Sequence, residues 1–352
     1  MEQQNSVQEL LNQLNQPGFC VSNNTIMALN QAAEAMLLNV GDSICAMLED
    51  NAEDYAGFNG GALYLPLRIG GQSHTATVTR LDGWDLFLLE SEEDAEQFHT
   101  LSLVSMELRK PLIHVITSAQ QLIAEQDASD PATASMNRGL MQLMRMVCNM
   151  SDVSRYQSFS QKETREICGF LQELLEKAKT LTDNTGIRVT GEFPGEAIYT
   201  QIDPEQLERA VWNLISNAIK FTPKGGSVHV RLTRRGRRLF LSVTDSGSGI
   251  AENILSTLFR RYQRMPAIED GRFGLGLGMV LIRITAANHG GTVLVDQPEG
   301  SGTRITMTLT ISRNNDSVIH SPILLPDYSS GWDHGLMELS DCLGADLYQN
   351  LL

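Results

Sequence analysis

Two long stretches in the middle of the chain repeat apolar residues every three or four positions. Residues with this spacing share one face of an α-helix. The first series is Leu101, Val104, Leu108, Leu112, Val115, Ala119 and Leu122, and the second is Met136, Leu140, Leu143, Val147 and Met150. A polar break at 127–131 separates them. We therefore expect a helical hairpin over residues 91–160, whose apolar face packs into a four-helix bundle in a dimer or against a neighbouring domain.

The patterns on either side of this hairpin predict two domains of different class. Residues 1–90 contain a helical segment at 30–38. Strand-like runs separated by Gly-Gly and Asp-Gly turn signals follow at 62–69, 74–81 and 84–90. Together they indicate an α+β domain with an antiparallel sheet. Residues 161–312 alternate helical and strand patterns with glycine-rich turns, which is typical of an α/β two-layer sandwich.

Residues 313–352 have the pattern of a C-terminal tail. Pro322 and Pro326 interrupt it, and residues 335–348 have the spacing of one short amphipathic helix. The pattern alone assigns this tail no role.

Composition and charge narrow the classes of function. The net charge is −15, which argues against a nucleic-acid binder. The five cysteines are scattered without a C-x-x-C pair, so neither a zinc site nor a disulfide framework is expected. The N-terminus is polar, and no apolar run approaches the ~18 residues that a membrane span needs. We expect a cytoplasmic protein without a membrane span.

A helical segment at 207–226 carries a polar stripe between two apolar faces. The stripe consists of Asn213, Asn217 and Lys220, at positions i, i+4 and i+7. Such a stripe is costly to bury unless partners satisfy it, and a ligand can supply those partners. Amide oxygens suit Mg²⁺, which usually shares its ligands with phosphates, and a lysine suits the phosphates themselves. The alternative is an exposed stripe on an ordinary surface helix.

Two glycine-rich segments follow. In the first, an apolar strand ends at Asp245, ahead of Gly247 and Gly249. A carboxylate there can accept from an exocyclic amine, as on adenine, and glycines let the backbone approach a flat ring. The second segment alternates Gly274, Gly276 and Gly278 before an apolar helix. Free N–H groups at a helix N-terminus form a cradle for phosphate.

Three elements in this order resemble the ATP-binding domain of sensor histidine kinases, and the resemblance covers residues 95–312. NLISNAIKFTP matches the N box of that family, and DSGSGI its first glycine box. LFRRYQR (258–264) matches the F box, GLGLGM (274–279) the second glycine box, and GSGTRI (300–305), with Thr303, the last glycine turn.

The resemblance implies ATP and Mg²⁺ as ligands, with a role for each matching residue. Asn217 would hold Mg²⁺, Asn213 and Lys220 would contact the nucleotide, and Asp245 would bind adenine. Phe259, Tyr262 and Arg264 would belong to a mobile lid over the phosphates. One departure is Leu275, where the family usually has Thr or Ser.

The wider superfamily includes the type II topoisomerases and Hsp90, which resemble one another in placing a glutamate four residues before the Mg²⁺-binding asparagine. That glutamate is the general base for water. Here the position is Asn213, and an amide cannot take the proton. This favours phosphoryl transfer over hydrolysis.

The segment SMELRKPL (105–112) stands where the family carries its His box. Met106 occupies the position of the histidine that receives the γ-phosphoryl group. A thioether has no removable proton, so Met106 cannot replace the imidazole, and Glu107 lacks the histidine that it would assist. His99 and His114 are the candidate substitutes, each more simply interpreted as a plain surface or interface histidine. Pro111 is expected to kink this helix.

Two hypotheses follow from the intact nucleotide motifs and the missing acceptor. In the first, the protein binds Mg-ATP, does not phosphorylate itself, and signals by conformation as a homodimer or with a related kinase. In the second, it phosphorylates a histidine or a Ser/Thr of a partner in trans. The resemblance also implies a response regulator as partner, and residues 1–90 resemble a PAS sensor domain.

Overall fold

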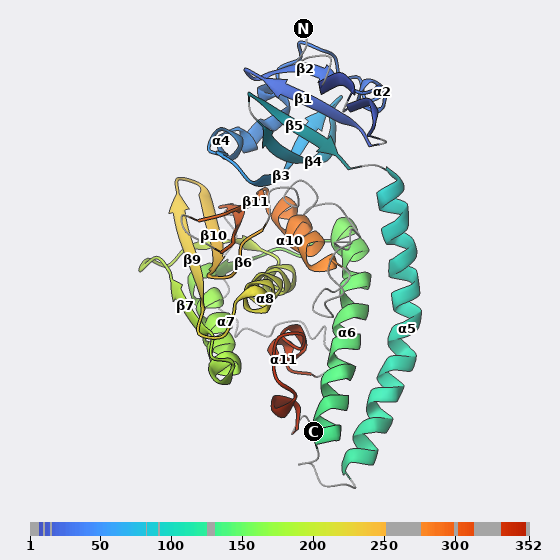
Figure 1. The fold of residues 1–352 in the computed structure, drawn as a ribbon, viewed down its shortest axis with the longest axis vertical. Helices are drawn as coiled ribbons and strands as arrows, with labels where there is room; N and C mark the ends of the chain where they lie inside the picture. Colours follow the sequence, from blue (N-terminus) through green and yellow to red (C-terminus); the bar gives the residue numbers. More distant parts are fainter. Residues whose placement is uncertain are drawn as a thin grey trace.

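The computed structural model describes residues 7–9, 11–14, 16–81, 83–90, 92–124, 131–250, 276–298, 302–312 and 332–349. These residues form an N-terminal α+β part, a long helical hairpin and an α/β part (Figure 1). The last described segment lies beside the hairpin. Within this part of the chain, none of the helices is long and apolar enough to cross a membrane.

The N-terminal part is a five-stranded antiparallel sheet with helices inserted between its second and third strands. Its strands are β1 (Gly18–Ser22), β2 (Thr25–Leu29), β3 (Ala62–Ile69), β4 (Gln72–Leu81) and β5 (Trp84–Leu89), in the order β2-β1-β5-β4-β3. The inserted helices are α2 (Gln31–Glu34), α3 (Cys45–Leu48), η1 (Glu49–Asn51) and α4 (Ala52–Ala56). The last three strands lie where the sequence predicted them, and the hairpin of β1 and β2 was not predicted.

The helix predicted over 30–38 is shorter than expected. Asn30 caps it by accepting a hydrogen bond from the backbone of Ala33, but the helix ends at Glu34. Leu37 has a φ of 66°, which a continuing right-handed helix cannot accommodate.

The hairpin consists of α5 (Glu92–Ala124) and α6 (Pro131–Ser158), which pack along their lengths. Helix α5 runs through Pro111 as one element. The apolar stripe of α6 serves two surfaces: Leu140, Val147 and Met150 are buried, whereas Leu143 is exposed. The buried residues contact the α/β part, so packing against a neighbouring domain is realised for α6.

The α/β part is a layer of helices on a mixed sheet. The helices are α7 (Ile167–Thr182), α8 (Pro204–Phe221) and α10 (Leu277–Asn288), with the short η2 (Asp183–Thr185). The strands are β7 (Arg188–Glu192), β9 (Ser227–Arg235), β10 (Arg238–Asp245), β11 (Val293–Asp296) and β12 (Arg304–Thr310), in the order β11-β12-β10-β9-β7. A separate two-stranded sheet joins β6 (Glu163–Glu166) and β8 (Tyr199–Ile202). Trp212 of α8 is fully buried.

The five-stranded sheet of the N-terminal part is continuous with the five-stranded sheet of the α/β part, which the sequence did not predict. Strand β3 pairs antiparallel with β11, with Leu63 opposite Leu294, and the result is one ten-stranded sheet. Gly61 precedes β3 with a φ of 88°, and its α-carbon lies too close to the Val295 carbonyl to carry a side chain. We call this pairing, with the side chains around it, the sheet junction.

A buried carboxylate completes the sheet junction. The Asp54 side chain of α4 accepts hydrogen bonds from the hydroxyls of Thr292, at 2.9 Å, and Thr308, at 3.1 Å. It also lies 3.6 Å from the guanidinium of Arg238. The N-terminal part is therefore attached to the α/β part by both main-chain and side-chain contacts.

The tail does not form the single amphipathic helix that was predicted over 335–348. It contains α11 (His334–Glu338) and, after a turn, η3 (Ala345–Tyr348). The hydroxyl of Tyr348 donates a hydrogen bond of 2.9 Å to the Leu336 carbonyl. That contact requires the chain to fold back on itself, so one continuous helix is excluded. Residues 332–349 pack against α6, α7 and α8, and we call these contacts the tail junction.

Candidate nucleotide-binding site

Helix α8 holds the predicted polar stripe. The side chain of Asp203 caps its N-terminus through the backbone N–H of Gln206, at 3.1 Å, and Pro204 occupies the first turn, where no N–H is needed. The structure divides the stripe by depth. Asn213 is 1% exposed, whereas Asn217 and Lys220 are half-buried near the C-terminal end of the helix.

Both polar groups of the Asn213 side chain have protein partners. Its amide nitrogen donates to the Arg209 carbonyl at 2.8 Å, and its oxygen accepts from the Arg145 guanidinium at 3.2 Å. Gly278 lies against the same amide, where a β-carbon would approach its oxygen to 2.6 Å. The predicted contact of Asn213 with a nucleotide thus stays a prediction, and in this arrangement α6 satisfies the side chain.

The second glycine segment lies beside the stripe of α8. Gly276 has a φ of 73° and precedes the first residue of α10, so this helix begins two residues earlier than predicted and includes Gly278. The Asn217 amide nitrogen donates to the sulfur of Met279 at 3.8 Å. The first turn of α10 therefore lies beside α8, and its role as a phosphate cradle stays a prediction.

Asp245 lies at the end of β10, where three segments meet. Its Oδ1 accepts from the backbone N–H of Gly247, at 2.8 Å, and from that of Thr303, at 3.2 Å. Burial raises the pKa of the Asp245 carboxyl, and these hydrogen bonds oppose that effect. Gly247 packs on the Phe221 carbonyl at the end of α8, and Gly302 on the Asp245 carbonyl, both too closely for a β-carbon.

The structure thus brings together predicted residues from separate segments. Asp245, Gly247, Gly249 and Thr303 surround the end of β10, and Gln297 donates from beyond β11 to the Ile250 carbonyl at 2.6 Å. The predicted lid residues Phe259, Tyr262 and Arg264 lie outside the described residues, as do Gly274 and Leu275.

The predicted acceptor segment lies on α5, which is separated from α8 by α6 (Figure 1). Met106 is 58% exposed, and Glu107 and His114 are exposed as well. The Ser105 hydroxyl is buried and donates to the Ser102 carbonyl at 2.7 Å. The side chain of His99 lies outside the described residues.

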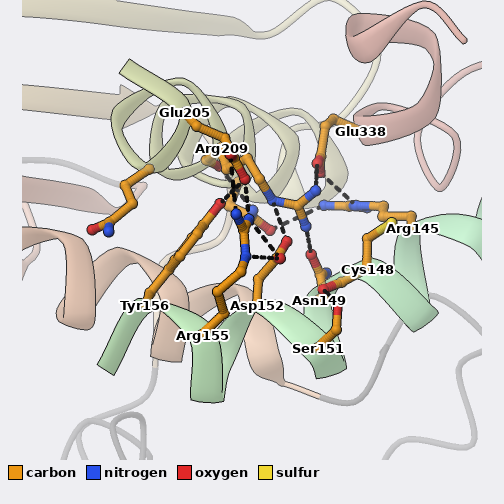
Figure 2. Close-up of polar contacts among 12 residues, drawn as sticks. Arg145, Cys148, Asn149, Ser151, Asp152, Arg155, Tyr156, Glu205, Arg209 and Glu338 are labelled. Atoms are coloured by element: carbon orange, nitrogen blue, oxygen red, sulfur yellow. Dashed lines mark hydrogen bonds and ion pairs between the residues drawn. The ribbon is translucent and has the colours of Figure 1, made fainter. Parts of the chain in front are cut away.

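Sequence reasoning missed a cluster of buried charges beside the stripe (Figure 2). The Glu338 carboxylate of α11 lies 3.0 Å from Arg145 of α6 and 3.2 Å from Arg209 of α8. Arg209 also lies 3.2 Å from Asp152. One signal was present in the sequence: Glu338 stands between Met337 and Leu339, in the apolar part of the tail pattern.

Comparison with known proteins identifies the class that this fold and site define. Residues 202–313 match the family described as "Histidine kinase-, DNA gyrase B-, and HSP90-like ATPase". The sensor-like histidine kinase SenX3 of Mycobacterium tuberculosis (strain H37Rv) is 30% identical over 213 residues, which are 58% of this chain and 52% of SenX3. Residues 202–313 are thus a histidine kinase-like ATPase domain, and the chain is similar to sensor histidine kinases over more than half of its length.

Two further comparisons place the match along the chain. The sensor histidine kinase WalK of Bacillus subtilis is 27% identical over 231 residues, which are 62% of this chain and 38% of WalK. The crystal structure of full-length ShkA in complex with AMPPNP shares the fold, with a TM-score of 0.52 and 21% identity over 61% of this chain and 47% of ShkA. The chain therefore spans about half the length of SenX3 or ShkA, and less of WalK.

Proposed function

We propose that this chain is a histidine kinase-like signalling protein that binds Mg-ATP and does not phosphorylate itself at the usual position. The observation that carries the nucleotide assignment is the meeting of the β10 end, the β12 start and the α10 N-terminus around α8. The family match over residues 202–313 supports it.

Each part of the site has a chemical role in this proposal. The buried Asp245 carboxylate accepts from the exocyclic amine of adenine. Asn217 offers an amide oxygen of the type that Mg²⁺ prefers, and the phosphates supply further oxygens. Lys220 and the N–H groups after Gly276 face the phosphates. Asn213, Gly274, Gly278, Tyr262 and Arg264 complete the predicted nucleotide contacts.

Met106 is the reason for proposing that self-phosphorylation is absent. Its exposed thioether on α5 cannot carry a phosphoryl group as imidazole does. Signalling would then depend on two conformations that bind nucleotide with different affinity.

The remaining parts of the chain suit a sensor and a dimer. The antiparallel sheet of residues 16–90, with helices inserted after β2, supports a PAS-like sensor role. The hairpin presents large apolar side chains to solvent, and burying them in a four-helix bundle would be favourable. They are Leu103, Val104, Leu108 and Val115 of α5, and Met136, Leu143 and Met146 of α6. We propose a homodimer, or a heterodimer with a related kinase, acting on a response regulator.

Nucleotide binding is tested by titrating Mg-ATP into wild-type protein and the variants Asn217→Ala and Asp245→Asn, with calorimetry as readout. Each variant is expected to bind about tenfold more weakly or worse, since each loses a direct ligand contact worth about 1.4 kcal/mol or more. Asn184→Ala, at an exposed position in η2, is the matched control and keeps wild-type affinity. Unchanged affinity in both site variants contradicts the assignment.

Phosphoryl transfer is tested with γ-labelled ATP. Wild-type protein is expected to carry no acid-labile label, and Met106→His to acquire it, whereas Met146→His on α6 does not. Label on wild-type protein contradicts the proposal, and its loss in His99→Ala or His114→Ala would identify the acceptor. Label on an added partner that cannot bind ATP itself, with none on this chain, supports the trans-kinase hypothesis instead.

A further inference from the structure

The C-terminal segment 332–349 lies between two parts of the protein. On one side, α6 contacts it: Asn137 donates to the Tyr348 carbonyl at 2.9 Å, and Arg138 to the Ser340 carbonyl at 2.9 Å. On the other side are α7 and α8, and Gly335 packs closely on Leu181 and Trp212. Four of its apolar side chains are at most 1% exposed, and they are Met337, Leu339, Leu343 and Tyr348.

The tail supplies the negative charge that two arginines of different elements share. Glu338 is 0% exposed, and its two oxygens lie near Arg145 of α6 and Arg209 of α8 (Figure 2). Asp341 adds a second carboxylate, 2.8 Å from Arg145. Without the tail, Arg145 and Arg209 would remain at the contact of α6 with α8, with Asp152 as the carboxylate partner of Arg209 there.

A contact between helices that depends on buried ion pairs is strongly weakened when one charge is removed. Removing one partner of a buried ion pair leaves an uncompensated charge, which is strongly unfavourable. Release of the tail removes the Glu338 carboxylate from both arginines at once. The charged part of the contact between α6 and α8 therefore depends on the tail, whereas the apolar packing of α6 on α10 does not involve it.

One guanidinium links this contact to the candidate nucleotide site. Arg145, held by Glu338 and Asp341, also donates to Asn213 and to the hydroxyl of Ser216, each at 3.2 Å. The thiol of Cys342 contributes a contact of 3.3 Å to the Ser216 carbonyl. A docked tail thus keeps Asn213 occupied by protein.

We propose that residues 332–349 act as an intramolecular clamp. The docked clamp holds α8 on α6 and keeps Asn213 bonded to Arg145. The released clamp lets the ATPase domain leave the hairpin and frees Asn213 for nucleotide, so clamp docking and ATP binding compete. Only the competition between clamp docking and ATP binding rests on the proposed nucleotide function.

The test compares Glu338→Gln with Asp333→Asn in the full chain, by hydrogen exchange of backbone amides. Both variants remove one carboxylate charge from the same tail element. Asp333 pairs with Lys177 and is 40% exposed, and asparagine retains its capping role at α11. In Glu338→Gln, amides of 332–349 and of the facing side of α6 are expected to exchange about tenfold faster or more, while β9, β10 and β12 stay protected. Asp333→Asn is expected to match wild type.

Equal exchange in Glu338→Gln and wild type would overturn the clamp. If Glu338→Gln does not fold, Tyr348→Phe gives a milder release, because it removes only the hydroxyl that donates to the Leu336 carbonyl. Faster exchange confined to the tail junction in Tyr348→Phe supports the clamp, and unchanged exchange overturns it.

A second measurement tests the competition. Glu338→Gln is expected to bind Mg-ATP several-fold more tightly than wild type, and saturating Mg-ATP is expected to accelerate exchange of 332–349 in the wild type, as linkage requires. Weaker binding by Glu338→Gln overturns the competition. If neither protein binds ATP, the nucleotide assignment fails, and the exchange result still decides whether the clamp exists.

Discussion

The sheet junction and the tail junction both attach the ATPase domain to other parts of the described chain, and they differ in their chemistry. At the sheet junction, the main chain of β3 pairs with β11, and the Asp54 carboxylate has two hydroxyl donors as well as Arg238. At the tail junction, the contact depends on buried charges centred on Glu338. Main-chain pairing tolerates changes of side chain, whereas a buried charge cluster fails when one member is lost. The first junction is therefore expected to be permanent and the second reversible.

The largest effect is expected from Arg209→Met, which removes a fully buried guanidinium. Glu338 and Asp152 would each lose a counter-charge, so the free energy of unfolding should fall by about 3–5 kcal/mol. Urea unfolding measures this. The control Arg231→Met breaks an exposed pair with Glu192 and should cost about 1 kcal/mol or less. A loss at Arg209 no larger than the control would mean that the tail junction does not depend on its charges.

Within the ATPase domain, acid is expected to act on His289. His289 is buried between α10 and the start of α8, where its Nε2 accepts from the Asp203 N–H at 2.9 Å. The pKa of His289 is lowered from 6.5 to about 4, chiefly by burial and also by Lys162, while the Thr285 carbonyl and Asp203 oppose this. The fold thus holds the neutral imidazole.

The stability from His289 is therefore present above pH 6.5 and lost as the pH falls toward about 4. The expected slope is at most about 1.4 kcal/mol per pH unit, or about 2 kcal/mol between pH 7 and 5. Urea unfolding at several pH values, with His289→Gln as reference, isolates this contribution from that of the carboxylates. Parallel pH profiles of the two proteins would show that His289 is not the sensitive group.

At the sheet junction, Asp54→Asn is expected to be milder. The amide oxygen still accepts from Thr292 and Thr308, so only the charge facing Arg238 is lost, at a cost of about 1–3 kcal/mol. Hydrogen exchange of β3 and β11 shows whether the pairing persists, as expected. Loss of the pairing in this variant would reverse the ranking of the two junctions.

The smallest effect is expected from Lys177→Ala at the rim of the tail junction. Its ion pair with Asp333 spans 2.8 Å, but both side chains are well exposed, so about 0–1 kcal/mol is at stake. Thermal unfolding of Lys177→Ala, measured together with that of Arg209→Met, compares the rim of the tail junction with its buried centre. A loss of stability comparable to that of Arg209→Met would show that the exposed pair, and not the buried charges, stabilises the tail junction.

Local signals account for what the sequence could predict. The spacing of apolar residues predicted the hairpin, and alternating glycines predicted the start of α10 to within two residues. Polar residues at i, i+4 and i+7 predicted that Asn213, Asn217 and Lys220 share a face of α8. These features depend on residues close together in the chain, where periodicity is informative.

The junctions lie beyond such signals because they join distant residues. Glu338 and Arg145 are separated by 193 positions, and nothing in either segment specifies the other. The pairing of β3 with β11 likewise depends on two strand edges, and alternation along a strand does not name its neighbour. Asn213 shows the same limit at the site: its position in the stripe called for a polar partner, and Arg145 supplies one from within the protein.

The continuous sheet restricts how this chain can be recombined. A chimera that replaces residues 1–90 with another sensor module would leave β11 without the strand that pairs with it here. Its N–H and C=O groups would then form an open edge, and open edges recruit strands from other molecules. A functional graft therefore needs a donor module whose edge strand, in the place of β3, matches the length of β11 and is preceded by a glycine at the position of Gly61.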